Sequence, residues 1–228
     1  MQWRGVEFVT KAPMSEGGTS GLSTYERIKQ AILDGTFEPG AALGESSLGA
    51  WCQVSRTPIR EALGRLEQDG LVVRTDRGMT VRRRTPEEIL DIYEARIYLE
   101  GAAARGAAER RTRVDLLRIE RQHALAMEAD ASDGDELARV NRDFHRTIWL
   151  ASHNEAIVDL LDRLNLHLLR YPATTLTFDG RWPQALDQHG ELVEAIVARD
   201  APRAQRVAEN HFTVARDIRL ELWDEDYA

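Results

Sequence analysis

Apolar residues recur every three or four positions along most of the chain, and this spacing predicts a mainly α-helical protein. Near the N-terminus the pattern indicates a helix over about residues 24–34, a short helix over residues 45–52 and a third helix over residues 56–68. The Pro39-Gly40 turn separates the first two helices. The apolar face of the third helix consists of Ile59, Ala62, Leu63 and Leu66.

The pattern changes twice after the third helix. Residues 71–74 and 79–82 are expected to form two short β-strands, joined by a tight turn at Asp76-Arg77-Gly78. From Thr85 the helical period returns, with a capping hydroxyl, an early proline and acidic residues at its start. A run of helices without strands predicts an all-α bundle. The expected helices cover residues 86–109, 112–131, 134–151, 154–170, 182–199 and 201–223.

The composition fits a globular protein of one or two domains, since 43% of the 228 residues are hydrophobic. We expect residues 1–20 to be poorly ordered, residues 21–84 to form one domain and residues 85–228 to form another. The single cysteine, Cys52, excludes an internal disulfide and fits a reducing compartment. Because no apolar segment matches a membrane span or a signal peptide, we expect a cytoplasmic protein that makes no membrane contact.

The net charge of −8 is unevenly distributed. Residues 21–84 carry 10 Lys and Arg against 8 Asp and Glu, a net charge of +2. Residues 85–228 carry 18 basic against 28 acidic residues, a net charge of −10. Only the N-terminal part is therefore suited to approach a polyanion such as DNA.

The order helix, short helix, helix and β-hairpin is typical of a winged helix-turn-helix, in which the second helix of the motif enters the major groove. In the predicted third helix the exposed donors lie in the first turn. Arginine suits the O6 and N7 atoms of guanine, and hydroxyl groups suit phosphates. The candidate DNA-binding residues are Ser55, Arg56, Thr57 and Arg60 in the third helix and Arg77 and Gly78 at the hairpin tip.

A purely structural interpretation of the same helix is also open. Arg56 and Arg60 could only solvate an exposed face, with Glu61 and Glu67 as local ionic partners. The spacing of the residues does not by itself decide between the two interpretations.

The N-terminal part resembles the DNA-binding domain of the GntR superfamily of bacterial repressors. The resemblance covers about 60 residues, and it implies that the six candidate residues above contact DNA or form the wing tip. Ser46 departs from the family pattern, because many relatives carry arginine or another long polar residue there. The resemblance rests on Pro39-Gly40, Leu43, Glu45, Leu48, Ser55-Arg56-Thr57-Pro58, Arg60-Glu61-Ala62-Leu63, Leu66, Gly70-Leu71 and Gly78.

Three of the six histidines fall on apolar stripes of the predicted bundle: His145, His189 and His211. A buried histidine needs a polar partner, and one shared metal ion satisfies several histidines at once. Alternatively, each histidine is satisfied separately by a hydrogen bond in the core. His167 is ambiguous: it lies beside two leucines, a position from which it could line the same cavity. His123 and His153 look ordinary, one within a helix and the other at a helix end.

The helical part resembles the FCD effector domain of the FadR-like GntR subgroup. The matching segments are "YEARIYLEGAAARGAA" and "NRDFHRTI", together with the two later histidines. The resemblance implies a divalent metal ion bound by Asn141, His145, His189 and His211, and the three imidazoles favour zinc or nickel. Asn141 is a departure, since it provides an amide in place of a carboxylate. A neutral amide oxygen binds a metal ion less strongly than a carboxylate does.

Arg96 lies on the inward stripe of its predicted helix, where a buried charge needs an anion. Two partners are open. Glu100, one helical turn away, would be a structural partner, whereas the carboxylate of a small organic acid would make Arg96 part of an effector site. The resemblance favours the effector carboxylate for the matching arginine. Arg96 and His167 are the candidate effector-binding residues.

The sequence therefore predicts a mainly α protein, with a winged helix-turn-helix followed by a helical bundle of about six helices. We expect a transcriptional repressor that binds a divalent metal ion and a small carboxylate effector. As a homodimer it would read a pseudo-palindromic operator in double-stranded DNA. A metal-dependent enzyme with an appended DNA-binding domain is the alternative, because three histidines also suit a catalytic metal. We expect no enzyme, since no acid or base stands at a recognisable spacing beside the histidines.

Overall fold

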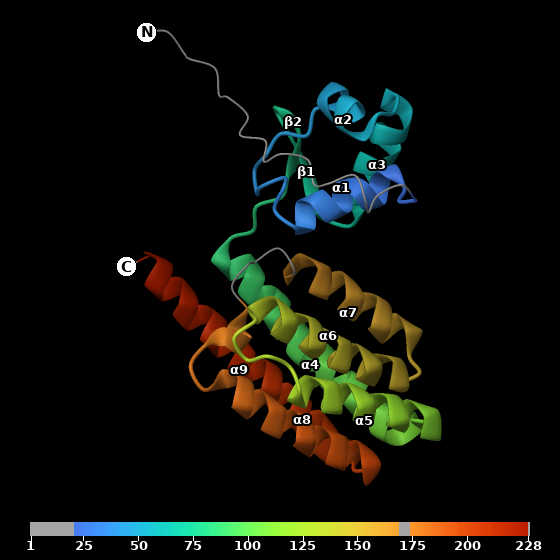
Figure 1. Ribbon diagram of the computed structural model, residues 1–228, viewed down its shortest axis with the longest axis vertical. Coiled ribbons are helices and arrows are strands. Elements are labelled where there is room, and N and C mark those ends of the chain that lie inside the picture. Colours follow the sequence, from blue (N-terminus) through green and yellow to red (C-terminus); the bar gives the residue numbers. More distant parts are fainter. Residues whose placement is uncertain (1–20, 169–173, 228) are drawn as a thin grey trace. The chain divides into compact units, whose positions relative to one another are not determined.

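The computed structural model describes residues 21–168 and 174–227. The chain divides into two compact units, with the boundary between Arg83 and Arg84 (Figure 1). We call the first unit the head and the second the body. The sequence pattern predicted helices in both and a β-hairpin in the head alone, and this is what the described residues show. None of the described helices is long and apolar enough to cross a membrane.

The head is a winged helix-turn-helix. Its strands are antiparallel, and β2 also makes an isolated bridge from Thr80 to Ala42. The strands differ slightly from the prediction, because Thr75 pairs with Gly78 and the turn holds only two residues. Gly78 has a φ of 99°, a conformation that glycine adopts without strain. The elements are α1 (Thr24–Leu33), α2 (Glu45–Cys52), α3 (Arg56–Gln68), β1 (Val72–Thr75) and β2 (Gly78–Val81).

Apolar side chains from every element of the head meet in one small core. Ser23 starts α1 with a capping box, in which its hydroxyl accepts from the Glu26 amide and the Glu26 carboxylate accepts in return. The predicted apolar face of α3 is buried, so the opposite face of that helix is available to a partner. The core includes Ile28, Ile32, Leu48, Ile59, Leu66, Leu71 and Val81.

The described part of the body is entirely helical, with a short 3-10 turn before the penultimate helix. The prediction missed this turn, η1, and it extended α5 too far. The last two residues of the predicted helix 154–170 lie outside the described residues. The elements are α4 (Pro86–Arg110), α5 (Arg113–Met127), α6 (Gly134–Ala151), α7 (Glu155–Leu168), η1 (Thr175–Thr177), α8 (Arg181–Val197) and α9 (Ala201–Tyr227).

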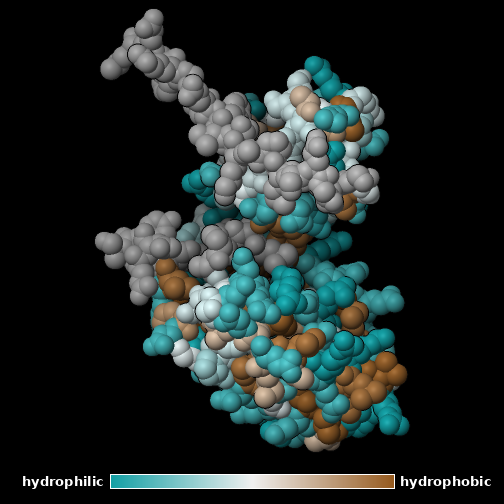
Figure 2. All heavy atoms as spheres, in the orientation of Figure 1, coloured by the Kyte–Doolittle hydropathy of each residue, from teal (hydrophilic) through white to brown (hydrophobic). Residues whose placement is uncertain are grey.

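Helices α4 and α9 pack closely through small residues. A side chain at Gly101 of α4 would place its Cβ 2.7 Å from Cγ of Glu209 on α9. Alanines of both helices join the main core, where α6 and α8 also contribute. Figure 2 shows a mainly polar surface on the body, with apolar side chains gathered near the start of α5 and the end of α6. The close packing of α4, α6, α8 and α9 positions the inward histidines and arginines described next.

Candidate functional sites

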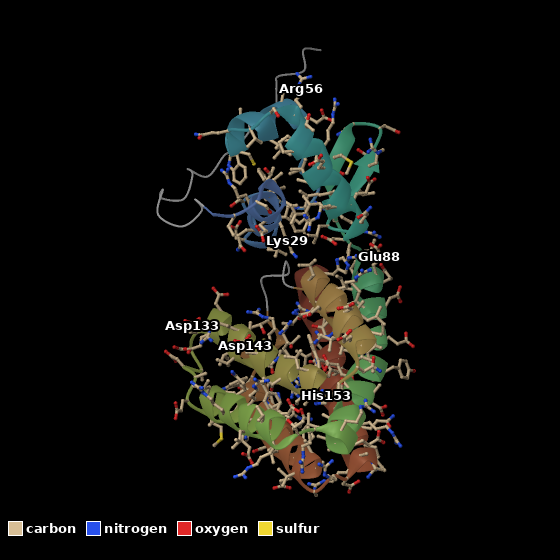
Figure 3. The ribbon with its side chains drawn as sticks, turned by 90° about the vertical axis from the view of Figure 1, so that its right-hand side faces the viewer. Lys29, Arg56, Glu88, Asp133, Asp143 and His153 are labelled. Atoms are coloured by element: carbon tan, nitrogen blue, oxygen red, sulfur yellow. The ribbon has the colours of Figure 1, made fainter. Side chains whose placement is uncertain are left out.

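The exposed start of α3 carries the predicted DNA-binding residues. The side chains of Ser55, Arg56, Thr57 and Arg60 are exposed, and Figure 3 shows Arg56 projecting from the helices of the head. Ser55 occupies the N-cap position of α3 but makes no capping hydrogen bond through its side chain. Its hydroxyl therefore stays accessible to a partner.

Both arginines of α3 are held by the first turn of α2. The Nε atom of Arg60 donates to both carboxylate oxygens of Glu45, at 2.9 and 2.8 Å. The Nη2 atom of Arg56 donates to the hydroxyl of Ser46 at 3.1 Å. Glu67, one of the two partners in the purely structural interpretation, pairs with Arg74 of β1 instead. The contact to Glu45 uses only Nε of Arg60, so both terminal nitrogens can reach outward.

The wing tip is exposed at both predicted positions, Arg77 and Gly78. The hydroxyl of Thr75 fixes the turn, since it accepts from the backbone amide of Arg77 and donates to the carbonyl oxygen of Gly78. The Arg77 side chain thus extends from a fixed turn, as a wing contact to DNA requires.

In the body, α6, α8 and α9 bring His145, His189 and His211 together. One ring nitrogen of each lies within 4.8 Å of those of the others, and all three side chains are buried. The Nε2 atoms of His145 and His211 face each other at 3.2 Å. This confirms that the three histidines point inward to one place, as their helical spacing predicted.

Burial keeps the three imidazoles neutral. It lowers the pKa of His189 to about 3, and it lowers the pKa values of His145 and His211 well below the ordinary range. Neighbouring positive charges, including that of Arg181, act in the same direction. A neutral imidazole is the form that binds a metal ion.

The residues at this place fit a divalent metal ion. Tetrahedral zinc ligands lie about 3.3 Å apart, close to the 3.2 Å that separates the two Nε2 atoms. Both ring nitrogens of His189 and the side-chain oxygen of Asn141 are buried without a hydrogen-bond partner among the described residues. Orphaned polar atoms of this kind are expected where a ligand completes the site. The alternative, in which each histidine has its own core hydrogen bond, finds no such bond for His189 among the described residues.

The Nδ1 atom of His211 faces two polar side chains. It lies 2.9 Å from Oε1 of Gln188 and 3.3 Å from Nη2 of Arg181. Arg181, a buried residue at the start of α8, donates to the same oxygen and to the carbonyl oxygen of His211. Burial lowers the pKa of Arg181 to about 10, so the guanidinium stays charged at neutral pH.

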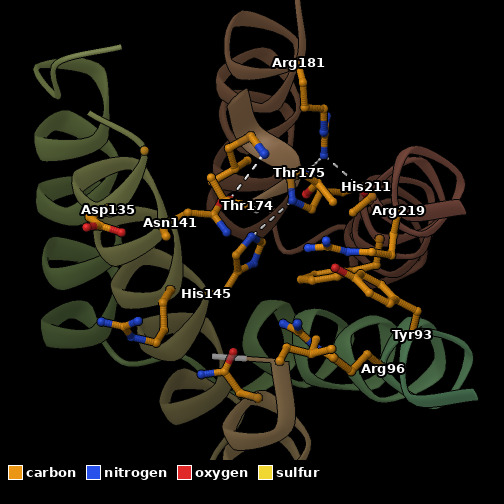
Figure 4. A pocket seen from close by; sticks show the side chains of 18 of the residues that line it. Tyr93, Arg96, Asp135, Asn141, His145, Thr174, Thr175, Arg181, His211 and Arg219 are labelled. Carbon is orange, nitrogen blue, oxygen red and sulfur yellow. Dashed lines mark hydrogen bonds between the residues drawn. The ribbon is translucent and has the colours of Figure 1, made fainter. Parts of the chain in front are cut away.

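A cavity of about 180 Å³ adjoins the histidines, and its wall is rich in positive charge. Figure 4 shows Asn141, His145 and Arg219 pointing toward this space. Among the described residues, four arginines and one acidic residue line it, so an anion is the ligand that its charge favours. The charged lining residues are Arg96, Arg142, Arg181, Arg219 and Asp135.

Arg96 contacts its structural partner and also faces the cavity. Its Nη2 atom donates to Glu100 at 2.8 Å, and Nε1 of Trp149 donates to the other oxygen of that carboxylate at 2.6 Å. The guanidinium also lies over the ring of Phe212, and Arg96 lines the cavity. The structural partner Glu100 is therefore present, and Arg96 still faces the cavity. His167 lies on α7 but does not line the cavity, where Asn165 and Leu168 of the same helix do.

Two protein-family models match this chain, one over the head and one over the body. The family described as bacterial regulatory proteins, gntR family, matches residues 21–81, and the FCD domain family matches residues 91–214, more than half of the chain. The chain belongs to the GntR family of bacterial transcriptional regulators and carries an FCD domain. The family resemblance noted in the sequence is thus confirmed. Members of this family and the related proteins are transcriptional regulators, which sets aside the alternative of an enzyme.

Similar proteins cover most of this GntR-family chain. The uncharacterized HTH-type transcriptional regulator YdhC of Bacillus subtilis (strain 168) is 31% identical, over 84% of this chain and 87% of its own. The HTH-type transcriptional repressor GlaR of Escherichia coli (strain K12) is 32% identical, over 84% of this chain and 92% of its own.

Solved structures share the fold of this GntR-family regulator. The McbR/YncC structure of E. coli superposes with a TM-score of 0.70 at 21% identity, covering 88% of this chain and 96% of its own. A GntR family member from Pseudomonas syringae pv. tomato str. DC3000 gives a TM-score of 0.55 at 25% identity, covering 89% and 85%.

Arg181, Glu45 and Gln188 are among the site residues whose roles the sequence analysis missed. The sequence contained a signal for Arg181. A cation in the first turn of a helix opposes the helix dipole, which indicates that this arginine has a role other than stabilising the helix. Glu45 and Gln188 had none, because their roles depend on contacts with residues 15 and 23 positions away.

Proposed function

We propose that this regulator is a repressor that senses a small organic acid through a metal-containing site in its body. As a homodimer in the cytoplasm, it would bind a pseudo-palindromic operator through two identical heads. The observation that carries the proposal is the cluster of three buried, neutral histidines beside an arginine-lined cavity.

The metal ligands would be His145, His189, His211 and Asn141. Zinc or nickel suits three imidazoles better than magnesium or calcium does. A cation held there would attract a carboxylate oxygen to an open coordination position. Three of these residues, Asn141, His145 and His211, line the cavity. An acid in the cavity would therefore lie beside the metal ligands.

The charge of the cavity suggests the class of effector. Glu100 neutralises Arg96, whereas Arg142 and Arg181 make no ion pair with the described acidic residues. Such a wall favours an acid with more than one anionic group. The volume of about 180 Å³ lies below the roughly 300 Å³ at which drug-sized ligand pockets begin, which restricts the acid to a small one.

The head would read DNA through the exposed start of α3. Glu45 engages only Nε of Arg60, which leaves both terminal nitrogens for the O6 and N7 atoms of one guanine. Arg56 and the hydroxyls of Ser55 and Thr57 would contact the same groove or its phosphates. Arg77 and Gly78 would reach the neighbouring backbone or minor groove as the wing tip.

A signal can pass from the cavity to the head along α4. This helix lines the cavity through Tyr93 and Arg96, and it begins at Pro86, directly after the head in the chain. An acid that contacts α4 together with α6 and α9 would favour one arrangement of these helices over another. It would thereby change the population of heads that can bind the operator.

The experiment compares the His189→Ala and His167→Ala variants, using metal content after purification and calorimetry with di- and hydroxy-acids. We expect His189→Ala to lose the metal and, with it, acid binding. His167→Ala is the matched control and should keep both, because His167 does not line the cavity. Full metal stoichiometry in His189→Ala would show that the site lies elsewhere.

A further inference from the structure

The two ring nitrogens of His189 are both buried, and neither has a hydrogen-bond partner among the described residues. A metal ion uses only one nitrogen of an imidazole. The second nitrogen of a metal-binding histidine almost always donates to a carboxylate, a carbonyl or a water molecule. His189 therefore needs an acceptor on the side of its ring that faces away from the metal ligands.

Each of the other two histidines of the cluster faces a polar side chain. The Nδ1 atom of His211 lies 2.9 Å from Oε1 of Gln188. The Nδ1 atom of His145 lies 4.0 Å from a carboxylate oxygen of Glu100, which is held in place by Trp149. His189 alone of the three lacks a comparable neighbour in the described part of the chain.

His123 of α5 lies next to His189 and has a matching deficiency. Its Nε2 atom is buried and has no partner among the described residues. The two ring centroids are 6.5 Å apart, and Phe144 stacks on His189 at 4.2 Å and borders His123 at 5.9 Å. A Cβ at Gly190 would lie 3.8 Å from Cε1 of His123, so this ring rests on α8 directly beside His189.

We propose that His123 is a positioning residue for the metal ligand His189. At a centroid separation of 6.5 Å the ring nitrogens cannot reach the roughly 3 Å of a direct hydrogen bond. One bridging water can accept the N–H of His189 and donate to Nε2 of His123, which satisfies both orphaned nitrogens. His123 thereby fixes the tautomer and the ring orientation of His189. This inference rests on the proposed metal site.

The assignment changes the expectation for His123, which looked ordinary in the sequence as a histidine within a helix. Its effect depends on an acceptor atom rather than on its volume. A leucine would fill similar space without accepting a hydrogen bond, whereas a glutamine would keep a polar acceptor. The two substitutions therefore separate the polar role from packing.

The experiment uses the full chain with Zn²⁺ as the probe, in competition with a chromogenic chelator, and Co²⁺ absorption as a second signal. We expect His123→Leu to bind Zn²⁺ about 10–100-fold more weakly than the parent and to alter the Co²⁺ spectrum. His123→Gln should recover most of the affinity. Thermal unfolding of the metal-free proteins should show His123→Leu folded and about as stable as the parent, because leucine fills similar space.

The outcomes separate the inference from the proposed function. Parent-like Zn²⁺ affinity in His123→Leu, with His189→Ala defective, would overturn the role of His123 and leave the metal site standing. Equal losses in His123→Leu and His123→Gln would also overturn it, since the acceptor would then not matter. Full binding by His189→Ala would instead refute the metal site itself. If His123→Leu does not fold, His123→Ala takes its place in the same comparison.

Discussion

At the scale of single residues, the arginines of α3 show how a contact within the protein can prepare a contact to DNA. Glu45 holds the Nε edge of Arg60, and Ser46 holds Arg56. Ser46, the predicted departure from the family pattern, thus supports an arginine in this chain. The pairs are exposed, so each contributes little to the stability of the head.

Replacement of Arg60 tests its proposed contact with a base. We expect Arg60→Ala to lose about 1–3 kcal/mol of binding free energy on an operator obtained by in vitro selection, and to relax preference at one base pair. Titration at matched salt measures both effects. Arg105→Ala, which removes an exposed arginine from the body, is the control for lost charge. Parent-like affinity and specificity in Arg60→Ala would contradict the contact.

Periodicity alone predicted which side chains point inward, because a helical residue is placed by its own sequence neighbours. The three histidines and Arg96 are examples, and all four are buried. Periodicity did not predict which groups face them. Arg181 reaches His211, 30 positions away, and only the packing of α8 on α9 brings them together.

At the scale of elements, helix starts were predicted better than helix ends. Thr85 and Thr112 both form capping boxes, and this signal is local. Helix α5 ends at Met127, four residues before the predicted end. Acidic residues at a helix C-terminus oppose the helix dipole, and the carboxylate of Asp130 accepts from both the amide and the hydroxyl of Ser132, which favours a turn there.

The cap of α5 gives a prediction about pH. Burial raises the pKa of Asp115, but hydrogen bonds from Thr112 and His153 outweigh burial and hold it below its ordinary value. His153 lies in the turn after α6 (Figure 3), so the cap also joins α5 to that turn. A carboxyl of this kind stabilises the fold above its unfolded pKa, near pH 4, and the stabilisation is lost as the pH falls through the folded value.

We therefore expect Asp115→Asn to lower the free energy of unfolding by about 1 kcal/mol at pH 7. The difference from the parent should shrink as the pH falls below about 4. Urea unfolding of the metal-free proteins, from pH 7 down to the lowest pH at which the parent stays folded, measures it. Asp162→Asn is the control, since its ion pair with Arg146 is half exposed and should contribute less than about 0.5 kcal/mol. A difference that widens toward low pH would contradict the sign.

At the scale of the whole molecule, charge is divided between two units with different tasks. The residues of the head carry a net positive charge, and those of the body carry the negative charge of the chain. Two heads can contact two half-sites of an operator, whereas one head makes few phosphate contacts and binds weakly at physiological salt. The proposed function therefore requires the body to hold two chains together.

Light scattering at micromolar concentration tests this assembly. We expect a mass of twice the 25.8 kDa of the single chain, without DNA or acid present. A truncated chain that begins at residue 85 should have twice the mass of its own single chain if the body holds the dimer. A mass of 25.8 kDa for the full chain would contradict the proposed homodimer.

The three histidines come from three different helices, α6, α8 and α9, and this affects the lifetime of the protein in a cell. An ion that binds only the folded chain favours folding by mass action, by about 2.7 kcal/mol at a hundredfold excess over its Kd. Proteases remove unfolded copies, so the folded fraction sets abundance. With the proposed site, a cell short of the metal would degrade this regulator faster, and metal supply would then reach the target genes through protein turnover.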